Sequence, residues 1–161
     1  MIANKKYFCA SLLIAAVTLL LDQASKWWAL DVVGLASRPP IEVTGFFNLV
    51  LVWNHGISFG MLSGHRLPLV LIALALVIVA VLLKWLASAH NRLMVAGIGL
   101  VIGGALGNVI DRARFGAVAD FLDFHLYGMH WPAFNIADSA IFMGVVVLCI
   151  ESIMHAPKKR S

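Results

Sequence analysis

Four long apolar stretches dominate this chain and restrict the folds that are open to it. They cover about residues 7–28, 67–86, 93–112 and 134–154. Each is close to the roughly 20 residues that an α-helix needs to cross the hydrocarbon core of a bilayer. Hydrophobic residues make up 61% of the 161-residue chain and charged residues only 12%, which excludes an ordinary soluble domain. We therefore predict one integral membrane domain over residues 1–161, with four transmembrane helices.

The distribution of lysine and arginine predicts how these helices are oriented, because short cytoplasmic segments carry an excess of both residues. An even number of spans places both termini on one side of the membrane. Basic residues at the termini and between the second and third spans all fall on that side: Lys5, Lys6, Lys84, Arg92, Lys158, Lys159 and Arg160. We expect this side to be cytoplasmic. The net charge of +4 is then a topology signal and does not indicate nucleic-acid binding.

The first apolar stretch has a second possible interpretation, because Lys5 and Lys6 before an apolar run also resemble the start of a cleaved signal peptide. No small-x-small cleavage site ends the run cleanly. It meets Asp22, Ser25 and Lys26 instead. We therefore expect this stretch to be a retained transmembrane span.

Two longer loops on the outer side contain segments with the composition of β-strands. Residues 43–53 are rich in Val, Thr, Phe and Trp and are bounded by turn residues, and residues 117–125 have a similar character. Because unpaired strand edges are not tolerated in lipid, we expect the two segments to pair as a small sheet on the outer membrane surface. The predicted fold class is a membrane all-α protein with four transmembrane helices and a small extracytoplasmic β-cradle.

Polar residues interrupt the outer end of the first span, and a glycine stripe marks the third. Asp22 and Lys26 are four residues apart, so they share a helix face and can pair. They could be a snorkelling pair at a helix end or a charge pair that shapes a site, and the spacing does not decide. Gly99, Gly103 and Gly107 leave one helix face bare, which predicts close packing against another helix.

More polar residues gather where the third span ends and the fourth begins. Asn108, Asp111 and Arg112 lie at the end of the third span, while Asn135 and Asp138 share a face at the start of the fourth. Asp138 by itself could simply be a first-turn residue whose negative charge is stabilised by the positive end of the helix dipole. Several costly groups at one depth argue instead for a shared site. The other groups expected at this depth are Lys26, Asn54 and Asp120.

Residues 118–124 add two aspartates in one extended segment. Asp120 and Asp123 are an odd number of residues apart, so their side chains point to opposite faces of a strand. Only one of them can face the predicted site at the membrane. The pattern of the sequence does not choose between them.

Other chemistries fit the sequence poorly. No nucleophile elbow surrounds a serine, and the His-Glu-x-x-His motif of zinc hydrolases is missing. His125, His130 and Asp123 lack the spacing of a metal-ligand motif, so we expect neither a metal nor a cofactor. The remaining chemistry is catalysis by two carboxylates acting on a water molecule. The alternative is a small proton-coupled membrane transporter using intramembrane carboxylates, but such sites usually lie near the midplane of repeat-built folds, and no repeat is visible here.

Five sequence elements follow one another in a recognisable order. They are DQASK at 22–26, NHGISFG at 54–60, GGALGNVIDR at 103–112, VADF at 118–121 and FNIADS at 134–139. Together they closely resemble the conserved elements of the lipoprotein signal peptidases, the bacterial signal peptidase II family. Ile57 stands where that family usually has a small residue, and Ala119 where it usually has a second Val. Neither departure touches an acidic position.

The resemblance implies a membrane aspartic endopeptidase of the bacterial cytoplasmic (inner) membrane, with its active site at the outer leaflet. It implies that the catalytic pair is Asp120 and Asp138, and not Asp123. It also implies supporting roles for Asp22, Lys26, Asn54, Asn108, Asp111, Arg112 and Asn135. The implied substrate is a diacylglyceryl-modified prolipoprotein, cut just before its lipidated cysteine to release the signal peptide. Membrane lipid is an implied partner, and cyclic peptide antibiotics such as globomycin are implied inhibitors.

A pair of neighbouring carboxyls explains how such an enzyme can work. Two close carboxylates cannot both ionise cheaply, so the pair is expected to hold one proton near neutral pH. The ionised member acts as base towards water and the protonated member polarises the scissile carbonyl. Which aspartate begins as the base stays open, because coupled acids share their titration. The dipole of the fourth helix favours the charged form of Asp138.

Overall fold

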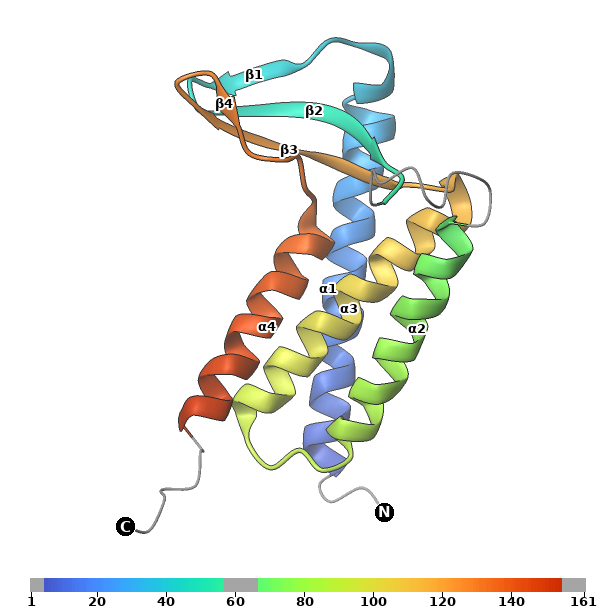
Figure 1. Cartoon of the computed structure of the whole chain (residues 1–161), viewed down its shortest axis with the longest axis vertical. Helices are drawn as coiled ribbons and strands as arrows, with labels where there is room; N and C mark the ends of the chain where they lie inside the picture. Colours follow the sequence, from blue (N-terminus) through green and yellow to red (C-terminus); the bar gives the residue numbers. More distant parts are fainter. Residues whose placement is uncertain (1–4, 57–66, 155–161) are drawn as a thin grey trace.

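A computed structural model describes residues 5–56 and 67–154 of the chain. Within these ranges, four helices are long and apolar enough to cross a membrane. They are α1 (Lys5–Trp27), α2 (Leu67–Leu86), α3 (Arg92–Phe115) and α4 (Ile136–Met154). The helices form a bundle below a small sheet, and both ends of the described chain lie at the far end of the bundle (Figure 1). The predicted membrane fold with four spans is confirmed.

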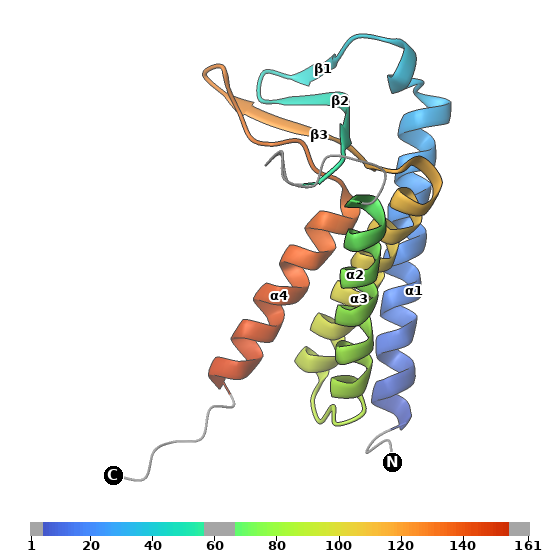
Figure 2. The ribbon, with the colours of Figure 1, turned by 45° about the vertical axis from the view of Figure 1, so that its right-hand side comes forward.

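The first helical segment is longer than the predicted span of residues 7–28. Helix α1 continues through a π-helical turn at Trp28–Val32 (η1), and a 3-10 turn at Leu35–Ser37 (η2) follows. Gly34 between them has a φ of 72°, in the left-handed region that glycine adopts without strain. Because of this extension, α1 rises beyond the other helices to the level of the sheet (Figure 2).

Helix α3 lies at the centre of the bundle and packs against α1, α2 and α4. The predicted glycine stripe explains its close approach to α1. A Cβ atom added at Gly99 would lie 2.7 Å from the carbonyl oxygen of Ser11, and one at Gly103 would be as badly placed against Ala15. The stripe therefore packs against α1, and substitution by larger residues would push the two helices apart.

The strands in the described part of the chain form a four-stranded antiparallel sheet in the order β1-β2-β3-β4. They are β1 (Ile41–Thr44), β2 (Phe47–Asn54), β3 (Val118–Leu126) and β4 (Met129–His130). The central pairing of β2 with β3 joins the two segments that the sequence predicted as strands. The small sheet beyond the helix ends is therefore confirmed.

Apolar contacts and one bridge attach the sheet to the helices. Ala29 and Leu35, in the extension of α1, are buried together with Phe121 of β3. Phe134 forms an antiparallel bridge with Leu122, so the chain passes directly from the sheet into α4. These contacts hold β3 and the start of α4 beside α1 and the last turns of α3, and the candidate site forms there.

Candidate active site

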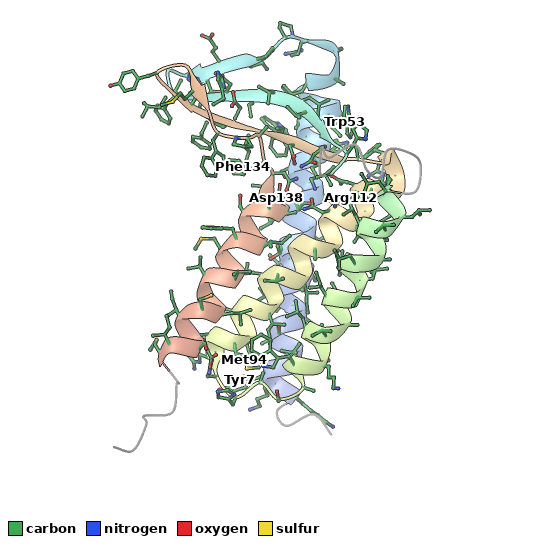
Figure 3. The ribbon with its side chains drawn as sticks, viewed as in Figure 1. Tyr7, Trp53, Met94, Arg112, Phe134 and Asp138 are labelled. Carbon is green, nitrogen blue, oxygen red and sulfur yellow. The ribbon has the colours of Figure 1, made fainter. Side chains whose placement is uncertain are left out.

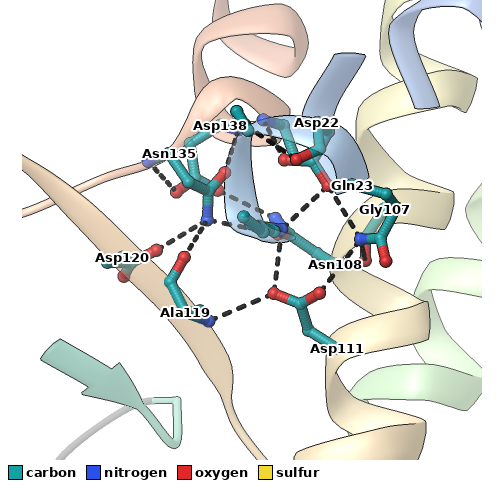
Figure 4. A network of polar contacts seen from close by, with 12 residues as sticks. Asp22, Gln23, Gly107, Asn108, Asp111, Ala119, Asp120, Asn135 and Asp138 are labelled. Carbon is teal, nitrogen blue, oxygen red and sulfur yellow. Dashed lines mark hydrogen bonds and ion pairs between the residues drawn. The ribbon is translucent and has the colours of Figure 1, made fainter. Parts of the chain in front are cut away.

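The polar residues predicted from the sequence converge where α1, α3 and α4 meet β3. Figure 3 shows Asp138 and Arg112 at this end of the bundle, while Tyr7 and Met94 lie at the opposite end. Most of the set is joined by hydrogen bonds and ion pairs in one network (Figure 4). The residues brought together are Asp22, Lys26, Asn54, Asn108, Asp111, Arg112, Asp120, Asn135 and Asp138.

Lys26 forms the centre of a buried ion cluster. Its Nζ atom lies 2.9 Å from Oδ2 of Asp22 and 2.9 Å from Oδ2 of Asp111, and it donates to Oδ1 of Asn108 at 3.3 Å. A snorkelling lysine would carry its ammonium group towards the aqueous boundary. Lys26 is only 3% exposed and is turned inward, so the charge-pair interpretation holds and the snorkelling one does not.

The two carboxylates of this cluster also bind backbone groups of other elements. Oδ1 of Asp22 accepts the backbone N–H of Ala137 at 2.9 Å, which ties α1 to the first turn of α4. Oδ2 of Asp111 accepts the backbone N–H of Ala119 at 3.1 Å, which ties α3 to β3. A buried ion pair is stable only when its remaining polar atoms are also satisfied. Here those atoms bind the elements that carry Asp120 and Asp138.

Gln23 belongs to the network although it was not predicted as a site residue. Its Nε2 atom donates to Asp22 at 3.1 Å, to Asp111 at 3.0 Å and to the carbonyl oxygen of Gly107 at 3.3 Å. An amide side chain in an apolar span needs such partners, and this requirement was the available signal. Gly107 has a second role, because a Cβ atom there would collide with the Asp22 carboxylate.

Asn135 connects the two aspartates of the predicted pair. Its Oδ1 accepts the backbone N–H of Asp138 at 2.9 Å, and Oδ2 of Asp138 accepts the backbone N–H of Asn135 at 3.3 Å. This reciprocal arrangement is a capping box at the start of α4. Nδ2 of Asn135 donates to Oδ1 of Asp120 at 2.6 Å. Asp138 therefore does cap the helix, but Asn108 also donates to its Oδ1 at 2.8 Å.

Asp120 projects from β3 into this network and is 1% exposed. Nδ2 of Asn54, at the end of β2, donates to its Oδ2 at 3.0 Å. Burial raises the pKa of Asp120 to about 6. The hydrogen bonds from Asn54 and Asn135 oppose this rise in pKa, and the negative charge of Asp138 adds to it. Asp120 therefore keeps its proton at pH values where an ordinary aspartate has lost it.

Arg112 lies at the edge of the site and is half-buried. Its guanidinium group is close enough to Asp138, Asp120 and Asp111 for electrostatic attraction to each. Within residues 5–56 and 67–154, however, no aspartate lies within 4.0 Å of it as an ion-pair partner. Its one hydrogen bond in that part of the chain is a long one, 3.5 Å from Nη1 to the carbonyl oxygen of Asn108. The group can therefore serve a bound ligand.

Asp123 occupies a different environment on the same strand. Nδ2 of Asn48 donates to its Oδ2 at 3.0 Å, and Nδ1 of His130 lies 2.9 Å from the same oxygen. Burial alone would raise the pKa of Asp123, but the hydrogen bonds from His130 and Asn48 lower it below the usual value. In the described part of the chain, no three His, Cys, Asp or Glu side chains are grouped to hold a metal ion. The structure thus brings Asp120, and not Asp123, into the network.

A cavity of about 380 Å³ opens beside Asp138. Its other lining residues are Trp131, Phe134, Ser139, Phe142 and Met143. Phe142 and Met143 lie on the exposed face of α4, which a membrane would cover with lipid. The candidate site is therefore open to an apolar ligand arriving from the bilayer side of α4.

The chain resembles proteins of one known family in both its sequence and its fold. The profile of the signal peptidase (SPase) II family matches residues 14–154. A lipoprotein signal peptidase of Rhodopseudomonas palustris (strain TIE-1) is 43% identical, over 91% of this chain and 93% of its own length. One of Methylobacterium sp. (strain 4-46) is 42% identical, over 86% of each chain.

A solved structure, described as a bacterial membrane enzyme structure by the in meso method at 1.9 Å resolution, has the same fold. It superposes with a TM-score of 0.77 at 31% identity, over 91% of this chain and 94% of that one. Sequence and fold therefore agree over nearly the whole chain. The chain belongs to the signal peptidase II family.

Proposed function

We propose that this protein is an aspartic endopeptidase whose catalytic pair is Asp120 and Asp138. Membership of the signal peptidase II family makes it a protease that removes signal peptides from prolipoproteins, and it does not favour the proton-coupled transporter. One observation carries the assignment of the pair. Asn135 binds the carboxyl of Asp120 with its side chain and exchanges hydrogen bonds with Asp138 through its backbone and side chain.

The environments of the two aspartates suggest a division of labour. Burial raises the pKa of Asp120 to about 6, so its protonated form persists to higher pH than that of an ordinary aspartate. Asp138 lies in the first turn of α4, where the helix dipole favours a negative charge, and it accepts a hydrogen bond from Asn108. We assign the starting role of general base to Asp138 and that of general acid to Asp120.

The reaction then follows from these protonation states. Asp138 takes a proton from a water molecule, whose oxygen attacks the scissile carbonyl carbon, while Asp120 donates its proton to the carbonyl oxygen. In the second step the amine nitrogen receives the proton held by Asp138 as the C–N bond breaks. Asp120 regains its proton from a hydroxyl of the tetrahedral intermediate. Both carboxyls end in the states in which they began.

The other network residues hold this pair in place. Asn54, Asn108 and Asn135 donate to the two carboxyls and so fix their orientation. The ion cluster of Asp22, Lys26 and Asp111 works one step further away, because it ties α1 and α3 to the elements that carry the pair. Arg112 supplies a positive charge for the peptide backbone or for the developing oxyanion.

The substrate in this proposal is a prolipoprotein with a diacylglyceryl group, cut just before the lipidated cysteine. The apolar cavity beside Asp138 supports this choice, because its lining reaches the lipid-facing side of α4. Acyl chains can stay in the bilayer while the scissile bond lies at the carboxyls. Membrane lipid is therefore a partner, and a cyclic peptide antibiotic such as globomycin would inhibit by occupying the same site.

Substitution of each carboxyl by the matching amide tests the pair directly. We expect Asp120→Asn and Asp138→Asn each to slow processing of a lipidated precursor by about 10³-fold, because general acid–base groups typically contribute 10²–10⁴-fold. Asp31→Asn is a matched control, since Asp31 is exposed on η1 outside the network. Wild-type cleavage by either folded site variant would refute the assignment. Activity lost in EDTA and restored by zinc would do the same.

The proposed location places both termini in the cytoplasm and the site at the outer leaflet of the bacterial inner membrane. The lysine and arginine distribution supports this orientation. Single cysteines at Gly45, in the β1–β2 turn, and at Ser88, in the α2–α3 connection, can test it after Cys9 and Cys149 are replaced. A membrane-impermeant thiol reagent should label only position 45 in cells with a permeabilised outer membrane. Labelling only at position 88 would reverse the orientation.

A further inference from the structure

A row of stacked aromatic rings leads from the candidate site to the tip of the sheet. Phe134, which directly precedes Asn135, stacks on Phe124 of β3 with ring centroids 5.9 Å apart. Phe124 in turn stacks on Phe46, at the β1–β2 turn, at 6.5 Å. Phe134 lies on the side of the sheet that faces the helices (Figure 3). The row therefore begins beside the catalytic pair and runs away from the bundle.

A shallow hollow of about 520 Å³ lies along this row, and we call it the sheet groove. Its apolar lining consists of Phe46, Phe124, Leu126, Met129 and Trp131. Trp131 also lines the cavity beside Asp138, so the two hollows share a wall. The sheet groove therefore adjoins the cavity of the candidate active site at Trp131.

Two apolar side chains that line the sheet groove are largely exposed instead of being packed in a core. Met129 is 74% exposed and Leu126 is 60% exposed, and they face each other in the register of β3 with β4. Contiguous apolar surface outside a membrane span usually marks a binding site. His125 and His130 complete the lining, with their rings stacked on each other and His130 bound to Asp123. Among the described residues no Lys, Arg, Asp or Glu lines the groove, so its mainly apolar surface fits uncharged side chains on an extended segment.

We propose that the sheet groove binds the first residues of the prolipoprotein that follow the lipidated cysteine. This inference rests on the proposed function, in which the signal peptide and acyl chains occupy the bilayer. The segment after the cut must leave the bilayer on the side of the site. The sheet extends beyond the helix ends on that side (Figures 1 and 2), so it lies on the path of this segment.

The length of the groove agrees with a short stretch of extended peptide. The successive ring centroids lie 5.9 and 6.5 Å apart, so the row matches about four extended residues at roughly 3.3 Å per residue. Aromatic faces and a flexible Met accept many apolar or small side chains without a fixed shape. The groove would therefore strengthen binding of precursors with uncharged residues after the cysteine.

Two synthetic lipidated precursors with the same signal peptide can test the inference on the purified full-length enzyme. One ends directly after the lipidated cysteine, and the other continues for six uncharged residues. We expect the longer precursor to have a KM about tenfold lower, from partial burial of a few apolar side chains. The groove variant carries Leu126→Ser and Met129→Ser together. It should process the longer precursor with the KM of the shorter one and a kcat close to wild type.

A variant at the same hairpin serves as the matched control. Tyr127 lies between the two substituted positions, is 94% exposed and does not line the groove. Its φ of 50° is in the left-handed region, which asparagine tolerates, so Tyr127→Asn should keep the tenfold preference for the longer precursor. Cleavage of the short precursor shows that each variant is folded.

Two outcomes would overturn the inference without touching the catalytic assignment. Wild-type enzyme could have equal KM values for the two precursors. Alternatively, the groove variant could raise KM equally for both, with an effect that changes with the lipid composition of the vesicles, which would identify the groove as a lipid-binding surface. Failure of the proposed function would be recognised by a different result, namely cleavage of both precursors by Asp120→Asn at the wild-type rate.

Discussion

Asp120 and Asp123 lie three residues apart on β3, and both are buried, yet their carboxyls behave in opposite ways. Asp120 faces the helix ends and is bound by the neutral amides of Asn54 and Asn135. Burial raises its pKa to about 6. Asp123 is bound within the sheet by Asn48 and by His130, and its pKa is lowered. The same residue type on the same strand thus holds its proton in one region and loses it readily in the other.

This difference shows that burial by itself does not decide the direction in which the pKa of a carboxyl shifts. A buried group that also has a close donor able to carry positive charge is stabilised in its ionised form. A buried group held only by neutral amides, near another carboxylate, keeps its proton and can act as an acid. The sheet therefore carries one aspartate suited to proton transfer and one suited to holding strands together.

The largest expected difference between the two regions is in activity. Asp120→Asn should reduce kcat by about 10³-fold, because it removes the proposed general acid. Asp123→Asn keeps the shape of the side chain and should change kcat by less than about tenfold, since only the support of β4 is weakened. Single-turnover rates with a lipidated precursor measure both. Equal losses would mean that the two regions do not differ in function.

The asparagines that bind the two aspartates, Asn135 and Asn48, should differ in the same way, with a smaller effect on kcat. Asn135→Ala removes the side chain that binds Asp120 and caps Asp138, and we expect kcat to fall by about 10²-fold through misplacement of the pair. Asn48→Ala is its counterpart on the sheet and should leave kcat near wild type. Circular dichroism of each purified variant controls for loss of folding. A larger loss from Asn48→Ala would contradict the comparison.

Stability should change with opposite signs in the two amide variants. The folded-state pKa of Asp120 lies above the ordinary value of 3.8. The contribution of Asp120 to the free energy of unfolding is therefore fully present below pH 3.8 and is lost as pH rises through 6. The folded-state pKa of Asp123 is lowered. The contribution of Asp123 to the free energy of unfolding is therefore present above pH 3.8 and is lost as pH falls through the folded-state pKa. At pH 8, Asp120→Asn should therefore raise the melting temperature and Asp123→Asn should lower it.

The expected gain for Asp120→Asn is about 3 kcal/mol, from the rise of the pKa of Asp120 from 3.8 to about 6. The expected loss for Asp123→Asn is about 2 kcal/mol, from the loss of a charged hydrogen bond. Thermal melts in the same detergent at pH 8 and pH 4 measure both. The gain from Asp120→Asn should disappear at the lower pH. A gain that persists unchanged at pH 4 would show that titration of this carboxyl is not its cause.

The smallest expected effect is a shift of the pH profile. Activity should fall as pH rises through about 6, where Asp120 loses its proton. Asn54 lowers this pKa by hydrogen bonding to the ionised carboxyl, so Asn54→Ala should move the alkaline limb of kcat/KM upward by about half a unit. Asp123→Asn should leave the limb in place. A downward shift in Asn54→Ala would show that another group controls this limb.

Much of the fold could be predicted because it depends on runs of neighbouring residues. Apolar length is a local property, and it indicated the spans that the structure describes as α1 to α4. The content of β-forming residues and the flanking turn residues likewise indicated the strands β2 and β3. The extension of α1 through η1 was not predicted, because the polar residues from Asp22 to Lys26 mark the end of the apolar run, whereas the helix continues and supports the sheet.

The sequence by itself also determined which polar residues share a helix face, since spacing alone sets this for Asp22 with Lys26 and for Asn135 with Asp138. Only the tertiary structure decided their partners. It turned Lys26 inward to Asp111, placed Gln23 between two helices, and set Asp120 and Asp123 in separate networks. The physical reason is that a pairing between elements depends on how they pack, and burial with its partners, not spacing along the chain, sets the charge state of a carboxyl.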